Sequence, residues 1–63
     1  MTSDTVTIYQ DAAGEWRWRR QAGNGEIIST SGEGYENKTY AEKIAQELNP
    51  STLDRAVNFV TEG

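Results

Sequence analysis

The sequence predicts an α+β fold, in which a three-stranded antiparallel meander precedes one helix and a C-terminal segment. The first observation is that apolar and polar residues alternate over three short segments before residue 31. The second is that clusters rich in glycine, asparagine and aspartate separate these segments, as turns do. The third is that the apolar spacing changes to a helical one after residue 37.

The first alternation covers residues 5–10, where Val6 and Ile8 point one way and Tyr9 the other. Period-two spacing of β-branched residues is typical of a strand with one buried face. We therefore expect Val6 and Ile8 to lie in the core. We expect residues 1–4 to form a disordered N-terminus.

The second alternation gives the strongest strand signal in the chain. Trp16 and Trp18 fall on one face, and Arg17 and Arg19 fall on the other. Aromatic residues are enriched in strands, and two indoles at a spacing of two indicate a face that packs into the core. We expect both tryptophans on the helix-covered face and both arginines on the open face.

A tight hairpin turn is predicted at Asn24-Gly25, because this dipeptide readily adopts positive φ at both central positions. The chain then returns as a third strand over residues 26–31, with Ile28 in the core. The predicted β-meander therefore spans residues 5–31.

Residues 37–48 are predicted to form the helix. Thr39 and Glu42 have the spacing of a capping box, so the helix is expected to begin near Asn37 or Thr39. Asn49-Pro50 ends it, because proline disfavours a helical residue before it. The apolar stripe of this helix contains Tyr40, Ala41, Ile44, Ala45 and Leu48.

We expect the tryptophans to pack on Ile44 and Leu48. The complete predicted core contains Val6, Ile8, Trp16, Trp18, Ile28, Tyr40, Ile44 and Leu48.

The residues after the proline fit two structures. Leu53, Ala56, Val57 and Val60 have helical spacing, whereas the run 57–61 is rich in β-branched and aromatic residues. Periodicity alone leaves both a helix and a strand open here.

Several runs together resemble the YegP-like domains, small proteins of unknown function. The match extends over residues 6–38 and weakens beyond the helix, where Leu48-Asn49-Pro50 departs from the family pattern. The runs that carry it are Val6-Thr7-Ile8-Tyr9-Gln10-Asp11, Gly14-Glu15-Trp16-Arg17-Trp18-Arg19, Asn24-Gly25-Glu26-Ile27-Ile28 and Ser31-Gly32-Glu33-Gly34-Tyr35.

The resemblance implies a β-β-β-α-β unit and places a C-terminal strand at residues 55–61. In that family two units form one continuous sheet and exchange their last strands. For this chain, which holds one unit, that implies a homodimer in which Val57, Phe59 and Val60 take part in the exchange. The resemblance implies no catalytic residues for this chain.

The size of the chain also favours self-association. For 7.0 kDa, apolar burial contributes on the order of 90 kcal/mol and ordering the chain costs on the order of 95 kcal/mol, so the two cancel. The 63 residues include no Cys and no His, so neither a disulfide nor a thiolate or imidazole metal site adds stability. Self-association into a homodimer is the remaining way to stabilise so small a core, although many domains of this size fold alone. No cofactor is expected.

Ten acidic residues against six basic ones give a net charge of −4. Such a surface suits a saline cytoplasm, because carboxylates maintain solubility there, and it equally suits an ordinary acidic protein. It disfavours nucleic acid and anionic membranes as partners. We find no membrane-spanning run and no signal peptide, so a cytoplasmic protein is expected.

One segment has a sequence pattern close to that of a phosphate-binding loop. Residues 32–39 read Gly-Glu-Gly-Tyr-Glu-Asn-Lys-Thr, with asparagine in place of the second glycine. Glu33 and Glu36 would face the phosphates, so we interpret the segment as a glycine-rich corner between a strand and a helix. Those carboxylates also have no second group placed against them for acid–base catalysis, and we predict no enzymatic activity.

Two functional classes remain. The favoured one is a non-catalytic homodimeric interaction or structural module. The alternative is a weak ligand or nucleic-acid binder that uses Tyr9, Arg17 and Arg19 on the open sheet face, and its binding would be strongly salt-sensitive.

Overall fold

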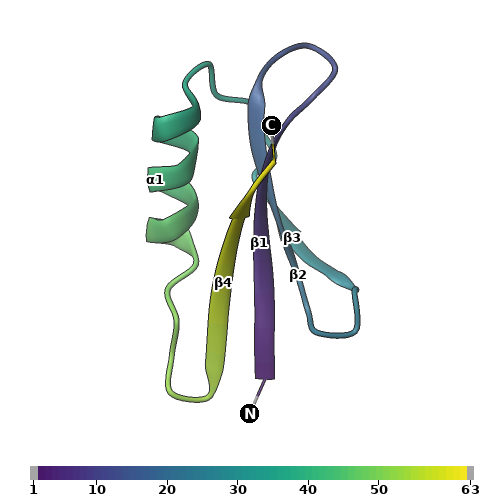
Figure 1. Cartoon of the computed structure of the whole chain (residues 1–63), viewed down its shortest axis with the longest axis vertical. Helices are drawn as coiled ribbons and strands as arrows, with labels where there is room; N and C mark the ends of the chain where they lie inside the picture. Colours follow the sequence, from purple (N-terminus) through teal and green to yellow (C-terminus); the bar gives the residue numbers. More distant parts are fainter. Residues whose placement is uncertain (1, 63) are drawn as a thin grey trace.

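The computed structural model describes residues 2–62 and has the predicted element order β-β-β-α-β (Figure 1). The four strands form one mixed sheet in the order β3-β2-β1-β4. The elements are β1 (Thr2–Gln10), β2 (Trp16–Gln21), β3 (Ile27–Thr30), α1 (Lys38–Leu48) and β4 (Arg55–Thr61).

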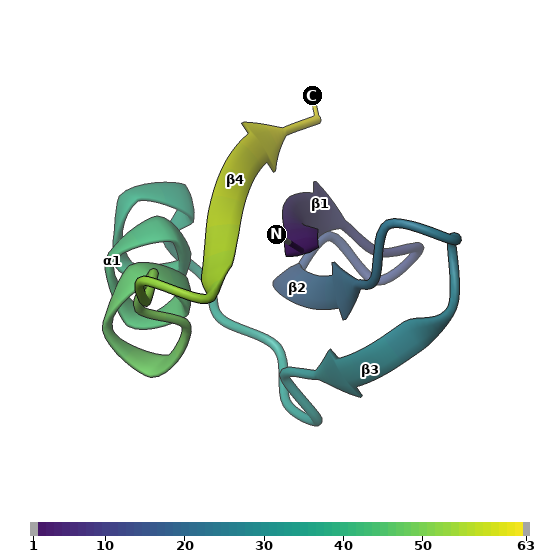
Figure 2. The same ribbon diagram turned by 90° about the horizontal axis from the view of Figure 1, so that it is seen from below.

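The sheet has two kinds of pairing. β1, β2 and β3 form the antiparallel meander, whereas β4 runs parallel to β1 on its other side. The parallel pairing requires a crossover, and α1 provides it. α1 lies on one face of the sheet, as the view along the strands shows, so the opposite face is open (Figure 2).

The expected disordered N-terminus is wrong for residues 2–4, whereas Met1 lies outside the described residues. β1 begins at Thr2 because β4 pairs with this part of the strand, with Ser3 level with Ala56 and Asp4 level with Val57. Residues 2–4 contain no apolar side chain, and the pairing with β4 is what extends β1 this far.

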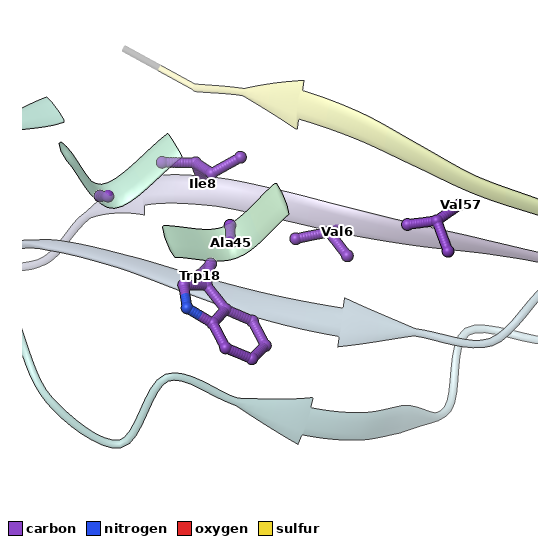
Figure 3. Close-up of a cluster of buried hydrophobic side chains, with 6 residues drawn as sticks. Val6, Ile8, Trp18, Ala45 and Val57 are labelled. Atoms are coloured by element: carbon purple, nitrogen blue, oxygen red, sulfur yellow. The ribbon is translucent and has the colours of Figure 1, made fainter. Parts of the chain in front are cut away.

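The core lies between α1 and the sheet and is small (Figure 3). Val6, Ile8 and Trp18 are buried as predicted, and Trp16 is half-buried against the cluster. The helix contributes two alanines, and β4 contributes one valine. The buried apolar residues are Val6, Ile8, Trp18, Ala41, Ala45 and Val57.

The helix contacts the sheet through a different part of its stripe than we predicted. Ala41 and Ala45 are fully buried, whereas Tyr40 and Leu48 are 51% and 62% exposed and Ile44 is half-buried. Small residues let the helix backbone approach β1 and β2 closely, and the larger side chains then lie on a flank of the helix rather than beneath it. Tyr40 and Leu48 are therefore not core residues, contrary to the prediction.

Ile28 is also not a core residue, since it is 47% exposed. The register between β2 and β3 shifts at Arg20/Gln21, where Ile27 rather than Ile28 is level with Gln21. A bulge of this kind places an extra residue opposite one partner and breaks the alternation of faces. α1 packs over β1 and β2, so β3 is exposed along its whole length.

The turns differ in detail from the prediction. At Asn24-Gly25 only the glycine has positive φ, at 89°. The Gly25 N–H donates to the Ala22 carbonyl and the Ala22 N–H to the Glu26 carbonyl, which makes a longer hairpin loop closed by one left-handed glycine. α1 begins directly after Asn37, one of the two predicted starts. The Asn37 Oδ1 caps it by accepting from the Tyr40 N–H at 3.0 Å, so Thr39 is not the capping residue.

Candidate functional site

The open sheet face carries the three residues that the sequence assigned to binding. Tyr9 is level with Arg17 on the neighbouring strand, and Arg19 is level with Thr7. The Arg19 guanidinium carbon lies 4.7 Å from the centre of the Tyr9 ring, close enough for a cation–π contact. The structure therefore places the three on one surface, as the alternation predicted.

Both arginines on this face are already engaged within the chain. Arg17 Nε donates to Asp11 Oδ2 at 2.6 Å, and Arg19 lies against Tyr9. An external anion would have to compete with these contacts.

Asp11 is the centre of a small polar network in the loop between β1 and β2. Its Oδ1 accepts from the N–H groups of Ala13 and Glu15. The pKa of the Asp11 carboxyl lies below its ordinary value of 3.8. The hydrogen bond from Arg17 is the largest cause of this lowering, and the backbone hydrogen bond from Glu15 is the second. The charged carboxylate thus organises the turn.

This network predicts a small loss of stability in acid. Because the folded-state pKa of Asp11 is lowered, its contribution is present above about pH 3.8 and disappears as the pH falls through the folded pKa. A carboxyl-carbon NMR titration should give an Asp11 midpoint below 3.8 in the native protein. Arg17→Gln should raise this midpoint, whereas the control Arg19→Gln should leave it unchanged. Equal midpoints in the native protein and Arg17→Gln would contradict the assignment.

The glycine-rich segment before α1 is held against β2. Tyr35 and Trp16 exchange two backbone hydrogen bonds of 2.8 and 2.7 Å. Gly34 approaches Glu15 so closely that an added Cβ would lie 2.6 Å from Glu15 Oε1, which explains why a glycine is needed there. Burial is the main cause that raises the pKa of the Tyr35 hydroxyl, followed by the charge of Glu33.

β4 is the edge strand beside β1, and it contains the residues assigned to strand exchange. Val57 is buried, whereas Phe59 and Val60 are 37% and 47% exposed. Phe59 is level with Val6 and so lies on the helix-covered face, while Val60 is level with Thr7 on the open face. In the single chain, β4 pairs with β1 of the same chain. All three residues are therefore placed in the chain's own sheet.

A buried carboxylate that sequence reasoning missed connects three strands. Asp4 in β1 is 0% exposed. Its Oδ2 accepts from Arg20 Nε at 2.9 Å, and lies 2.8 Å from Arg20 Nη2 and 3.3 Å from Arg55 Nε. Arg20 belongs to β2 and Arg55 to β4, so one carboxylate connects the central strand to both neighbours.

The same cluster reaches the end of the helix. Arg20 Nη1 donates to Asn49 Oδ1 at 3.2 Å, and Asn49 Nδ2 donates to the Ala45 carbonyl at 2.7 Å. Asn49 is itself buried, with 3% exposure. The second oxygen of Asp4, Oδ1, is buried and has no hydrogen-bond partner within residues 2–62. The cluster therefore fixes β4 and the end of α1 relative to the meander.

A signal for this cluster was present in the sequence. Asp4 continues the period-two face of Val6 and Ile8, and Arg20 continues that of Trp18. Extending both alternations by two residues places an acid and a base on the core side of adjacent strands.

Residues 2–62 contain no enclosed pocket and no group of three or more acidic residues that could hold a metal ion. Within the same residues, the single helix is too short and too polar to cross a bilayer.

The sequence of residues 11–49 matches the family described as "Domain of unknown function (DUF1508)". The UPF0339 protein of Neisseria meningitidis serogroup B is 47% identical over 53 residues, which cover 84% of this chain and 93% of that protein. The chain belongs to the DUF1508 family. These are the YegP-like domains that the sequence resembled, and their function is unknown.

Two further comparisons agree with membership of the DUF1508 family. A UPF0339 protein of Neisseria meningitidis serogroup A has the same identity of 47% over 53 residues. An NMR solution structure of a protein from Haloferax volcanii is similar, with 35% sequence identity and a TM-score of 0.66. This similarity covers 78% of the chain and 85% of the Haloferax volcanii protein. The DUF1508 match itself covers β2, β3 and α1, whereas Asp4 and all of β4 lie outside it.

Proposed function

We propose that this chain acts as a non-catalytic homodimeric module, in which two copies join their β4 edges to form one continuous sheet. The observation that carries the proposal is the composition of this edge. β4 is seven residues long, has exposed apolar side chains on both faces, and contains neither Lys nor Pro. Proteins that keep an edge strand unpaired usually block it with such residues or cover it with a loop. The Ser51–Thr52 segment covers the edge as far as Val57, so the part of β4 beyond Val57 is the part suited to pairing.

The small core supports the same proposal. Its six buried apolar residues include two alanines, which bury little apolar surface. A chain of 63 residues gains stability when a second copy covers Phe59 and Val60. A typical specific interface buries about 800 Å² per partner, so the contact would have to include the adjoining helix surface as well as the β4 edge.

Charge along β4 is complementary to itself. The strand begins at Arg55 and is followed at its far end by Glu62. A second copy related by a two-fold axis pairs antiparallel, so the basic end of each strand lies beside the acidic end of the other. Phe59 and Val60 then meet their counterparts close to the axis.

Strand exchange fits the same arrangement. In an exchanged dimer the β4 strand of each chain occupies the partner's sheet and makes the same pairs with β1. Asp4 and Arg55 would then be joined between chains instead of within one chain. The order of strands in the continuous sheet is identical in the exchanged and the unexchanged dimer.

The proposal is tested by placing a charge at the edge. Val60→Lys should raise the dimer dissociation constant at least about tenfold, because two lysines close to the axis repel each other. Thr30→Lys is the matched control, since it places the same charge on the exposed edge strand β3. Sedimentation equilibrium measures both constants, and circular dichroism confirms that both variants fold. Equal dissociation constants for the native protein and Val60→Lys would refute pairing through β4.

A further inference from the structure

The segment between α1 and β4 folds back along the outer edge of β4. The Thr52 N–H donates to the Arg55 carbonyl at 2.9 Å, and the Arg55 N–H lies 3.3 Å from the Thr52 carbonyl and 3.1 Å from Thr52 Oγ1. Ser51 Oγ accepts from the Val57 N–H at 3.0 Å. The Ser51–Thr52 segment therefore occupies edge positions that a second strand would need.

The hydrogen-bond pattern shows which groups of β4 point outward. The Glu62 N–H donates to the Ile8 carbonyl, and Ile8 is level with Thr61. In a parallel ladder, alternate residues direct both backbone groups toward the neighbouring strand. The odd-numbered residues of β4 thus face outward, which agrees with the bond from Val57 to Ser51. In the closed chain the outward N–H groups of Arg55 and Val57 are hydrogen-bonded to Thr52 and Ser51. Those of Phe59 and Thr61 point to the free edge.

The turn that closes this contact has unfavourable residues. Thr52 and Arg55 are joined by the two-residue loop Leu53-Asp54, and Leu53 is 97% exposed. Two-residue hairpin loops strongly favour residues at positive φ, such as Asn-Gly. Within residues 2–62 no residue other than glycine has positive φ, so Leu53 and Asp54 do not form the positive-φ turn that such loops favour. A short loop without favoured turn residues is the place where the following element can swing out and exchange between chains, so these two residues are the candidate hinge.

We propose that the Leu53-Asp54 turn is the hinge that sets the balance between a closed monomer and a strand-exchanged dimer. In the closed monomer the Ser51–Thr52 segment covers part of the β4 edge. The inference rests on the proposed homodimer and states how that dimer is controlled. In the closed chain the Ser51–Thr52 segment covers the first half of this edge. When the turn straightens, Arg55 and Val57 release it, and the full length of β4 becomes available to the second copy.

Opposite changes in the hinge provide the test. The double variant Leu53→Asn/Asp54→Gly supplies a favoured turn and should raise the dimer dissociation constant at least about tenfold. Deletion of Leu53 and Asp54 removes the turn, prevents closure and should give a dimer even at low micromolar concentration. The control Leu53→Ser removes the exposed side chain without favouring the turn, and it should behave as the native protein does.

Exchange itself is detected by linking chains through introduced thiols. Ser3 and Ala56 are exposed and level with each other on adjacent strands, and the chain has no cysteine of its own. A variant with Ser3→Cys and a second variant with Ala56→Cys are unfolded together, refolded as a mixture and treated with a short thiol-to-thiol linker. A linked pair of two different chains is expected, because exchange places the two thiols side by side.

The outcomes separate the hinge from the dimer. An unchanged dissociation constant in Leu53→Asn/Asp54→Gly, or a folded monomer after the deletion, would overturn the hinge while a native dimer still stands. A native protein that stays monomeric while the deletion variant dimerises would support the hinge and refute the native homodimer. Linked pairs from the mixed thiol variants support exchange, and their absence from a dimeric sample refutes it.

Discussion

Replacement of Asp4 with alanine should lower the free energy of unfolding by about 3–5 kcal/mol. The side chain of Arg20 is only 16% exposed and would lose the carboxylate that neutralises it. Removal of one partner of a buried ion pair typically costs about 3–5 kcal/mol, because the other charge remains buried and unpaired. A domain of 63 residues has about 3–9 kcal/mol of stability in total. The loss is therefore comparable to the whole free energy of unfolding.

Urea denaturation followed by circular dichroism measures this effect. Glu47→Ala, at an exposed carboxylate on α1, is the control and should change stability by less than about 0.5 kcal/mol. The paired variant Asp4→Leu/Arg20→Met should recover most of the loss, since a buried ion pair can be replaced by apolar residues at little cost. Native stability in Asp4→Ala would show that the cluster does not hold the sheet together.

Trp18→Ala should cost about 3–5 kcal/mol, the range observed when a large buried aromatic side chain is removed. Trp18 is 4% exposed and is the largest side chain in the core. Its indole N–H is buried without a hydrogen-bond partner in the described residues. Trp18→Phe removes that unsatisfied donor while it keeps most of the apolar area, so it should cost less than half as much.

Trp16→Ala is the comparison for this variant, because Trp16 lies on the same face and is only half-buried. It should cost clearly less than Trp18→Ala in the same denaturation experiment. Equal losses for the two alanine variants would mean that the core is not centred on Trp18.

The fold was largely predictable because its elements carry local signals. The alternation around Trp16 and Trp18 reflects the pleat of a strand, and Asn49-Pro50 ends the helix where the backbone geometry requires it. The C-terminal strand was the exception. Its residues fit a helix as well as a strand, and the family resemblance decided correctly in favour of the strand.

The contacts between elements were harder to predict. A helical stripe defines a face but not which residues lie at its centre. Ala41 and Ala45 took that place because small side chains permit a close approach, and Leu48 was left exposed. Asp4 was missed because its burial depends on β4, which is distant in sequence. Ile28 is exposed because α1 covers β1 and β2 rather than β3, and because a bulge shifts the register of β3; neither feature leaves a clear mark in the sequence.

The mass of the native protein in solution is the most direct test of the proposed dimer. Light scattering coupled to gel filtration should give about 14 kDa at high micromolar concentration, twice the chain mass of 7.0 kDa, by simple two-fold association. On dilution the mass should fall toward that of one chain, as expected for a reversible dimer. A folded protein that remains at 7.0 kDa across the whole concentration range would contradict the proposed function.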